Sequence, residues 1–157
     1  MLVVELASIY EHSGRTDDSI ALYQGILDKA PNAPWALNNL AMLLVTYKSD
    51  AASLARAQKL SDALASSSMV NVLDTRGWVK FKSGDYHGAE SLLQQVVDKV
   101  PDAPEFRYHL GMAQLKSGEA QAAERNLETA VDANKPFVGL EDARATLAQL
   151  KKSGSVG

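Results

Sequence analysis

The chain has 157 residues, and its 16 basic and 19 acidic side chains give a formal net charge of −3 at pH 7. Hydrophobic residues make up 46% of it and charged residues 22%, ordinary globular figures that argue against long disorder. The lack of cysteine excludes disulfides, thiolate metal sites and a cysteine nucleophile. We expect no nucleic-acid partner, because the charge is near zero, and no membrane insertion, because no apolar run approaches the roughly 20 residues that span a bilayer.

Short motifs recur along the chain at a fixed period. The segment Pro31-Asn32-Ala33-Pro34 returns as Pro101-Asp102-Ala103-Pro104, 70 residues later. A Ser-Gly pair at 13–14 returns at 83–84, again after 70 residues, and at 117–118 after another 34. Seventy residues are two units of about 35, so the spacing predicts four repeats, one of which lies unmarked between the two obvious ones.

Each repeat is expected to form two amphipathic helices. Apolar residues such as Leu40 and Leu44 recur at helical spacing. The Ser-Gly pairs fit the left-handed residue that ends a helix, and Pro34 and Pro104 fit the first turn of the next one. We therefore predict an all-α fold, an α-solenoid of about four helix-turn-helix repeats with a capping helix. Its expected ranges are repeats at 1–33, 34–69, 70–103 and 104–136, a capping helix at 137–152 and a tail at 153–157.

The repeats resemble the tetratricopeptide repeat (TPR), whose 34-residue pattern is W-x2-L-G-x2-Y, then A-x3-F, then P. The residues in these places in the first repeat are Val3, Leu6, Ala7, Tyr10, Ser19, Tyr23 and Pro31. Those of the third are Leu73, Arg76, Gly77, Lys80, Ala89, Leu93 and Pro101, and those of the fourth are Arg107, Leu110, Gly111, Gln114, Ala123 and Leu127. The resemblance covers residues 1 to about 136 and implies an array of paired helices.

The second repeat departs from the pattern after its first helix. Leu37, Leu40, Ala41 and Leu44 match, but the second helix aligns on Leu60 and Ala63 only with about three added residues. The irregularity around 46–52 predicts either a longer first helix or a small surface loop.

The two ends of the array differ. Residues Leu140, Ala143, Leu147 and Leu150 share one side of the last helix, as expected of a lid on a terminal repeat. The start is uncapped and apolar, with Leu2, Val3 and Leu6. We expect the chain to be the C-terminal part of a longer array, with a face that stacks on missing repeats or on another copy.

No catalytic, metal or cofactor site is expected. His12, His87 and His109 lie in three different repeats, and no pair has the i, i+4 spacing of a helical metal site. No G-x-S-x-G, P-loop or G-x-G-x-x-G sequence occurs. These patterns indicate a protein that is not an enzyme.

The resemblance implies that the first helices line a concave groove. The groove residues expected to contact a partner protein are Trp35, Asn38, Asn39, Met42, Asn71, Asp74, Trp78, Lys82, Tyr108, His109, Met112 and Lys116. Trp78 is expected near the centre, since tryptophan and methionine supply large contact areas. Aromatic residues at helical spacing are also typical of a core, and a terminal helix is an alternative occupant of the groove. Only Asn39 fits the family's clamp for a C-terminal carboxylate, so that mode of binding is disfavoured.

The leading hypothesis is a module that binds a segment of another protein in the groove. The alternative is a scaffold or oligomerisation module of a larger bacterial assembly, with self-association through the apolar N-terminal face. The third repeat resembles repeats of bacterial envelope proteins for secretion, pilus biogenesis or exopolysaccharide export. A cytoplasmic location is the default, and a periplasmic or envelope-associated one stays open.

Overall fold

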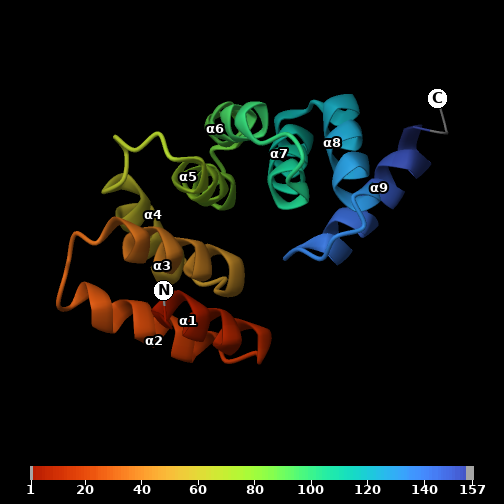
Figure 1. Ribbon diagram of the computed structural model, residues 1–157. Helices are drawn as coiled ribbons and strands as arrows, with labels where there is room; N and C mark the ends of the chain where they lie inside the picture. The colour runs from red at the N-terminus through yellow and green to blue at the C-terminus, as the bar shows by residue number, and fades with distance from the viewer. Residues whose placement is uncertain (1, 155–157) are drawn as a thin grey trace. The chain divides into compact units, whose positions relative to one another are not determined.

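The computed structural model describes residues 2–154, and all regular structure in that range is helical (Figure 1). The helices are α1 Leu2–His12, α2 Thr16–Leu27, α3 Pro34–Tyr47, α4 Ala51–Asp62, α5 Val70–Lys82, α6 Tyr86–Lys99, α7 Pro104–Ser117, α8 Ala120–Asp132 and α9 Leu140–Gly154. The all-α expectation is confirmed. Between residues 2 and 154, no helix combines the length and the apolar character that crossing a membrane requires.

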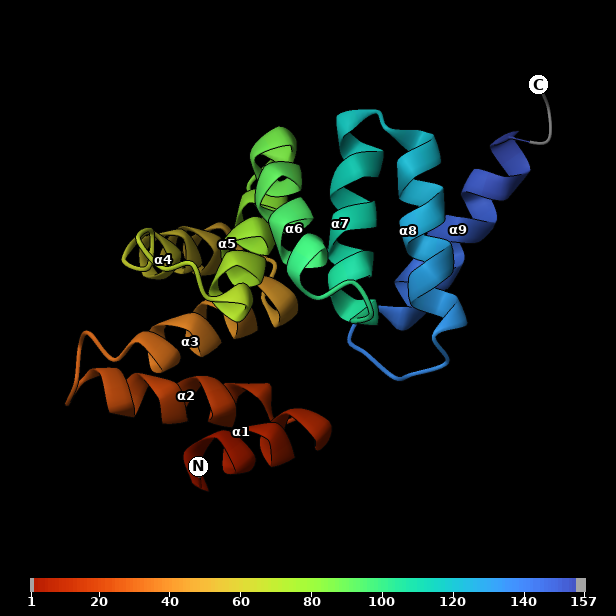
Figure 2. The same ribbon diagram turned by 45° about the horizontal axis from the view of Figure 1, so that its top comes forward.

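The chain divides into two compact units, Met1–Ser68 and Met69–Gly157. In the first unit each helix packs against the next, from α1 to α4 (Figure 2). Its core contains Ala7 and Tyr23 from the first helix pair, Leu40 and Ala41 from α3, and Ala57 from α4. The unit therefore buries one continuous seam between consecutive helices.

The second unit continues the same packing from α5 to α9. Its central cluster joins Ala89, Leu93 and Val97 of α6 to Leu110 and Ala113 of α7. Close approach within each helix pair depends on glycine. A Cβ atom at Gly77 would lie 2.6 Å from Leu93, and one at Gly111 would lie 2.9 Å from Leu127.

The helix ends follow the sequence signals. Gly14, Gly84 and Gly118 have φ values of +70°, +85° and +95°, the left-handed conformation expected where a first helix ends. Asp50 and Asp85 cap the starts of α4 and α6, each accepting a hydrogen bond from a backbone N–H three residues on. These signals fix the short links that turn each helix back on its partner.

The irregular second repeat differs from both sequence expectations. α3 has 14 residues, as α7 does, and only residues 48–50 separate it from α4, so neither a longer first helix nor a loop forms. The additional residues lengthen the start of α4: its first buried residue, Ala57, is six residues in, whereas Ala89 is three residues into α6. The buried residues of α4 are Ala57 and Ser61, and Leu64, two residues beyond its end, is buried as well, so the alignment on Leu60 and Ala63 was wrong by about one residue.

The last helix buries Ala143 and Leu147 and leaves Leu140 and Leu150 half-buried. It runs to Gly154, so the expected tail begins later than residue 153. Residues 155–157 of that tail, and Met1, lie outside the described residues.

Candidate partner-binding surface

Four of the expected groove residues lie on α3, in the first unit. Trp35, in the first turn, is 44% exposed, and the edge of its ring packs on Tyr23 of α2 with 6.1 Å between ring centroids. Asn39 Nδ2 donates a hydrogen bond of 3.0 Å to the Tyr23 hydroxyl, and its Oδ1 accepts one of 3.3 Å from Asn38. Burial raises the pKa of Tyr23, which therefore stays a neutral phenol. The exposed indole of Trp35 therefore packs on Tyr23, whose hydroxyl is hydrogen-bonded to Asn39. Met42 lies half-buried on the same helix.

Asn38 differs from its neighbour in being buried. Its side chain is 5% exposed, and its Oδ1 atom has no hydrogen-bond partner among the described residues. The sequence placed it with Asn39 as a groove residue; of the two, Asn39 has the greater access to solvent.

Trp78, expected at the centre of an open groove, is instead a core residue of the second unit. It is 3% exposed and is stacked on Phe81 of its own helix α5 and on His109 of α7, with centroid separations of 4.6 and 4.1 Å. Tyr108 packs on the same indole at 5.6 Å. Aromatic contacts from two helices remove it from solvent, so the expectation of groove exposure was wrong.

A buried ionisable pair lies beside this tryptophan. His109 Nδ1 donates to Asp74 Oδ1 over 2.8 Å, and both side chains are almost fully buried. Glu105 is half-buried and lies one turn before His109 on α7. Burial raises the pKa of Glu105, the nearby His109 lowers it and the Asp74 carboxylate raises it further. The sequence marked Asp74 and His109 separately as groove residues and did not predict that they bond to each other.

Tyr108 is covered by the segment that leads into α9. Its hydroxyl donates a 2.8 Å hydrogen bond to Asp142, and its ring packs on Phe137 at 5.7 Å. Gly139, with φ +100°, lies so close to the ring that a Cβ atom would collide with it. Burial and the Asp142 carboxylate raise the pKa of Tyr108. The terminal segment thus fills part of the first-helix surface of this unit, as the alternative for the groove allowed.

The remaining residues of the expected site stay accessible in the second unit. Asn71, Lys82 and Lys116 are exposed, and Met112 is half-buried. The Lys82 ammonium lies 4.9 Å from the centre of the Trp78 ring. In the second unit, the expected partner-binding residues thus fall into two groups. One group is accessible to solvent, and the other, Asp74, Trp78, Tyr108 and His109, is buried.

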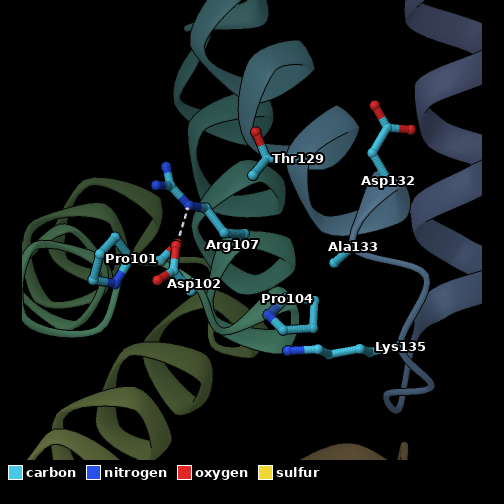
Figure 3. Close-up of a pocket in the computed structure, with 8 residues that line it drawn as sticks. All are labelled: Pro101, Asp102, Pro104, Arg107, Thr129, Asp132, Ala133 and Lys135. Atoms are coloured by element: carbon cyan, nitrogen blue, oxygen red, sulfur yellow. Dashed lines mark hydrogen bonds between the residues drawn. The ribbon is translucent and has the colours of Figure 1, made fainter.

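Within residues 2–154, no three His, Asp or Glu side chains are grouped so that they could hold a metal ion. A cavity of about 460 Å³ lies elsewhere in the second unit, between the α6–α7 link and the end of α8 (Figure 3). Arg107 lines it and donates from Nε to the Pro101 carbonyl over 2.8 Å and from Nη1 to Asn126. Carboxylates of Asp102 and Asp132 and the Lys135 ammonium also line it. The sequence contains one signal for this cavity: Arg107 is a charged residue at a position where the repeat pattern has tryptophan.

The family assignment rests on two matches. Family models described as "Tetratricopeptide repeat" match residues 2–34 and residues 80–136, which together make up more than half of the chain. The chain belongs to the tetratricopeptide repeat family. No curated protein sequence matches it.

Solved structures similar to this TPR protein have the same fold. The thermophilic TPR protein TTC0263 of Thermus thermophilus is 18% identical, with a TM-score of 0.75, over 96% of this chain and 80% of that one. The pilF protein of Pseudomonas aeruginosa is 20% identical, with a TM-score of 0.71, over 98% and 68%. MamA from Desulfovibrio magneticus RS-1, residues 41 to the end, is 17% identical, with a TM-score of 0.62, over 96% and 92%. All three organisms are bacteria, which suggests a bacterial origin for this chain.

Proposed function

We propose that this TPR protein binds a segment of a partner protein on the surface of its first helices and performs no catalysis. The TPR fold implies a protein–protein interaction module. The observation that carries the finer proposal is Trp35, which is 44% exposed yet held in place by Tyr23. Tryptophan dominates binding hot spots because it buries a large area at little entropic cost.

The surroundings of Trp35 suit an extended or helical peptide. Asn39 offers an amide whose second N–H is not used by Tyr23, and an amide both donates to and accepts from a peptide backbone. Met42, one turn further along α3, adds an adaptable apolar contact. Trp35, Asn39 and Met42 are the proposed anchor of the partner segment in the first unit.

The second unit contributes a different surface to the proposal. The buried Trp78, Tyr108 and His109 support the helices, and the partner would meet the exposed Asn71, Lys82 and Lys116 and the half-buried Met112. Lysines at the ends of α5 and α7 favour carboxylates of the partner at that edge.

The test compares capture of partners by three forms of the chain. Wild type, Trp35→Ala and Val138→Ala are immobilised, incubated with lysate of the source organism, and the retained proteins are quantified by mass spectrometry. Both replaced residues are exposed, so both variants should keep the fold. We expect a partner retained by wild type and Val138→Ala and lost by Trp35→Ala, with affinity reduced about 30-fold or more, the loss of one hot spot. Equal retention by all three would contradict the proposal.

A second candidate function is that of a scaffold or oligomerisation module of a larger bacterial assembly. The observation that favours it is the exposed apolar face of α1, with Leu2 and Ile9. Loss of partner capture in Trp35→Ala supports groove binding, whereas self-association that depends on α1 supports assembly.

A further inference from the structure

Arg107 is a half-buried cation whose hydrogen-bond partners in the described part of the chain are all uncharged. Its Nε donates to the Pro101 carbonyl and its Nη1 to the Asn126 side-chain oxygen, each over 2.8 Å. Among residues 2–154 its guanidinium forms no ion pair, and its Nη2 makes no hydrogen bond. Arg107 therefore retains both N–H donors and a positive charge for a ligand.

Buried neighbours hold this guanidinium in one position. Asn126, which accepts from Arg107, is 8% exposed and donates from Nδ2 to Gln114 Oε1 over 2.8 Å. Gln114 is buried as well. The backbone link before α7 and a buried side chain of α8 thus fix the arginine from two sides. A side chain that is already ordered loses little further entropy when it binds a ligand.

Arg107 lines the cavity of about 460 Å³ between the α6–α7 link and the end of α8, here called the Arg107 cavity (Figure 3). Its charges balance, because Arg107 and Lys135 are positive while Asp102 and Asp132 are negative. Among residues 2–154, none of these four side chains forms an ion pair. The cavity therefore presents both signs of charge to whatever enters it.

A local turn after α8 brings Lys135 to the cavity. Asn134 has φ +52°, the left-handed conformation that asparagine adopts more readily than most residues. Its Nδ2 donates to the Asp132 carbonyl over 3.2 Å. Lys135 follows directly and lines the same cavity as Arg107. The turn thus adds a second cation to the site.

These charges define the chemistry of the ligand. The fork of N–H donors on a guanidinium matches a carboxylate, and Lys135 supplies a second donor. Asp102 and Asp132 would repel a phosphate or a polyanion and attract a basic group beside the carboxylate. The volume lies in the range of pockets that hold drug-sized ligands, so two neighbouring side chains of a peptide fit.

We propose that the Arg107 cavity is a second protein-binding site, which takes a partner segment with an acidic and a basic side chain next to each other. The carboxylate binds Arg107 and Lys135, and the basic group lies near Asp102 and Asp132. The proline rings that line the cavity contact the aliphatic parts of the segment. No lining residue belongs to the peptide-binding set proposed above, so this site goes beyond that function.

Nuclear magnetic resonance titration of the ¹⁵N-labelled chain tests the proposal. The probe is the peptide Gly-Glu-Lys-Gly, blocked at both ends and added up to about 20 mM, because a contact of this size binds with a millimolar dissociation constant. We expect saturable shifts of the backbone amides at 102–107 and 129–135. The blocked peptide Gly-Gln-Lys-Gly should bind about tenfold more weakly, since it lacks the carboxylate that Arg107 binds.

Variants of the lining residues locate the contact. Lys135→Gln and Asp132→Asn change exposed side chains and should each weaken binding about two- to fivefold. Arg107→Lys keeps the charge but removes the fork, and should weaken binding about tenfold. Lys152→Gln, at an exposed lysine on α9, is the matched control and should bind like wild type.

Circular dichroism shows whether each variant is folded. If Arg107→Lys loses helicity, Lys135→Gln and Asp132→Asn decide, because exposed side chains contribute little to stability. Three results overturn the proposal: no localised shifts up to about 20 mM, equal binding of the two peptides, or wild-type binding by both folded variants. Trp35→Ala should bind the probe like wild type. Loss of the probe in Trp35→Ala would place it on the first-helix surface instead, so the two proposals fail separately.

Discussion

The Nδ1 atom of His109 on α7 lies 2.8 Å from a carboxylate oxygen of Asp74 on α5, and both side chains are almost fully buried. The bond joins the first helices of two consecutive repeats next to the Trp78 ring. A buried donor that loses its acceptor retains the cost of its desolvation. The pair therefore favours the one arrangement of α5 and α7 in which this hydrogen bond forms.

Removing one partner of this pair should destabilise the second unit. We expect Asp74→Ala to lower the free energy of unfolding by about 1–3 kcal/mol, because it leaves the imidazole without its acceptor. His109→Ala should cost a similar amount, and the double variant less than the two losses added, since the residues share one interaction. Urea denaturation of the four proteins measures this coupling, and strict additivity would contradict it.

The two tryptophans should respond differently to truncation. Trp78→Ala removes a buried indole and should cost about 3–5 kcal/mol, with a visibly lower melting temperature. Trp35→Ala removes an exposed ring, and its cost should be well below that of Trp78→Ala. Thermal unfolding of both variants checks the order. A Trp78→Ala protein as stable as Trp35→Ala would show that the aromatic cluster is not core.

Gly139 and Gly118 provide a matched test of the segment over Tyr108. Both have φ near +100°, so alanine at either position costs roughly 1–2 kcal/mol in backbone strain. Only at Gly139 does the added Cβ atom meet the Tyr108 ring; nothing lies within 4 Å at Gly118. We expect Gly139→Ala to be the more destabilising and to speed amide hydrogen exchange in α9. Equal effects would mean that the segment does not pack on Tyr108.

Glu105 should make stability depend on pH. Burial is the main cause of its raised pKa, so the folded state favours the protonated acid. That contribution is fully present below the ordinary glutamate pKa of about 4.3 and is lost as the pH rises through the folded-state pKa. Glu105→Gln should therefore raise the melting temperature relative to wild type at pH 7, and the difference should vanish towards pH 4. A variant that is less stable than wild type at pH 7 would contradict this assignment.

The fold was predictable because its signals are local and repeated. The Ser-Gly pairs place glycine where first helices end, and the Pro-x-x-Pro segments mark the junctions of the repeats. The start of α4 was not predictable in the same way. α4 has three more residues before its first buried position than α6 has, and only packing shows that Ser61 rather than Leu60 faces the core.

The candidate surface was harder to predict, because helical spacing gives the face of a residue and not what covers it. Trp35 and Trp78 both occupy first helices, yet one is exposed and the other lies among Phe81, His109 and Tyr108. The Tyr108–Asp142 bond spans 34 residues and no local pattern encodes it.

The most direct test of partner binding is a photo-crosslinking comparison of two positions in the first unit. A photoreactive benzoylphenylalanine replaces Trp35 on α3 in one protein and the exposed Gln58 on α4 in another. After irradiation with the captured partner, we expect a covalent adduct from position 35 and little from position 58. Adducts from position 58 with none from position 35 would place the partner on the second helices and contradict the proposed function.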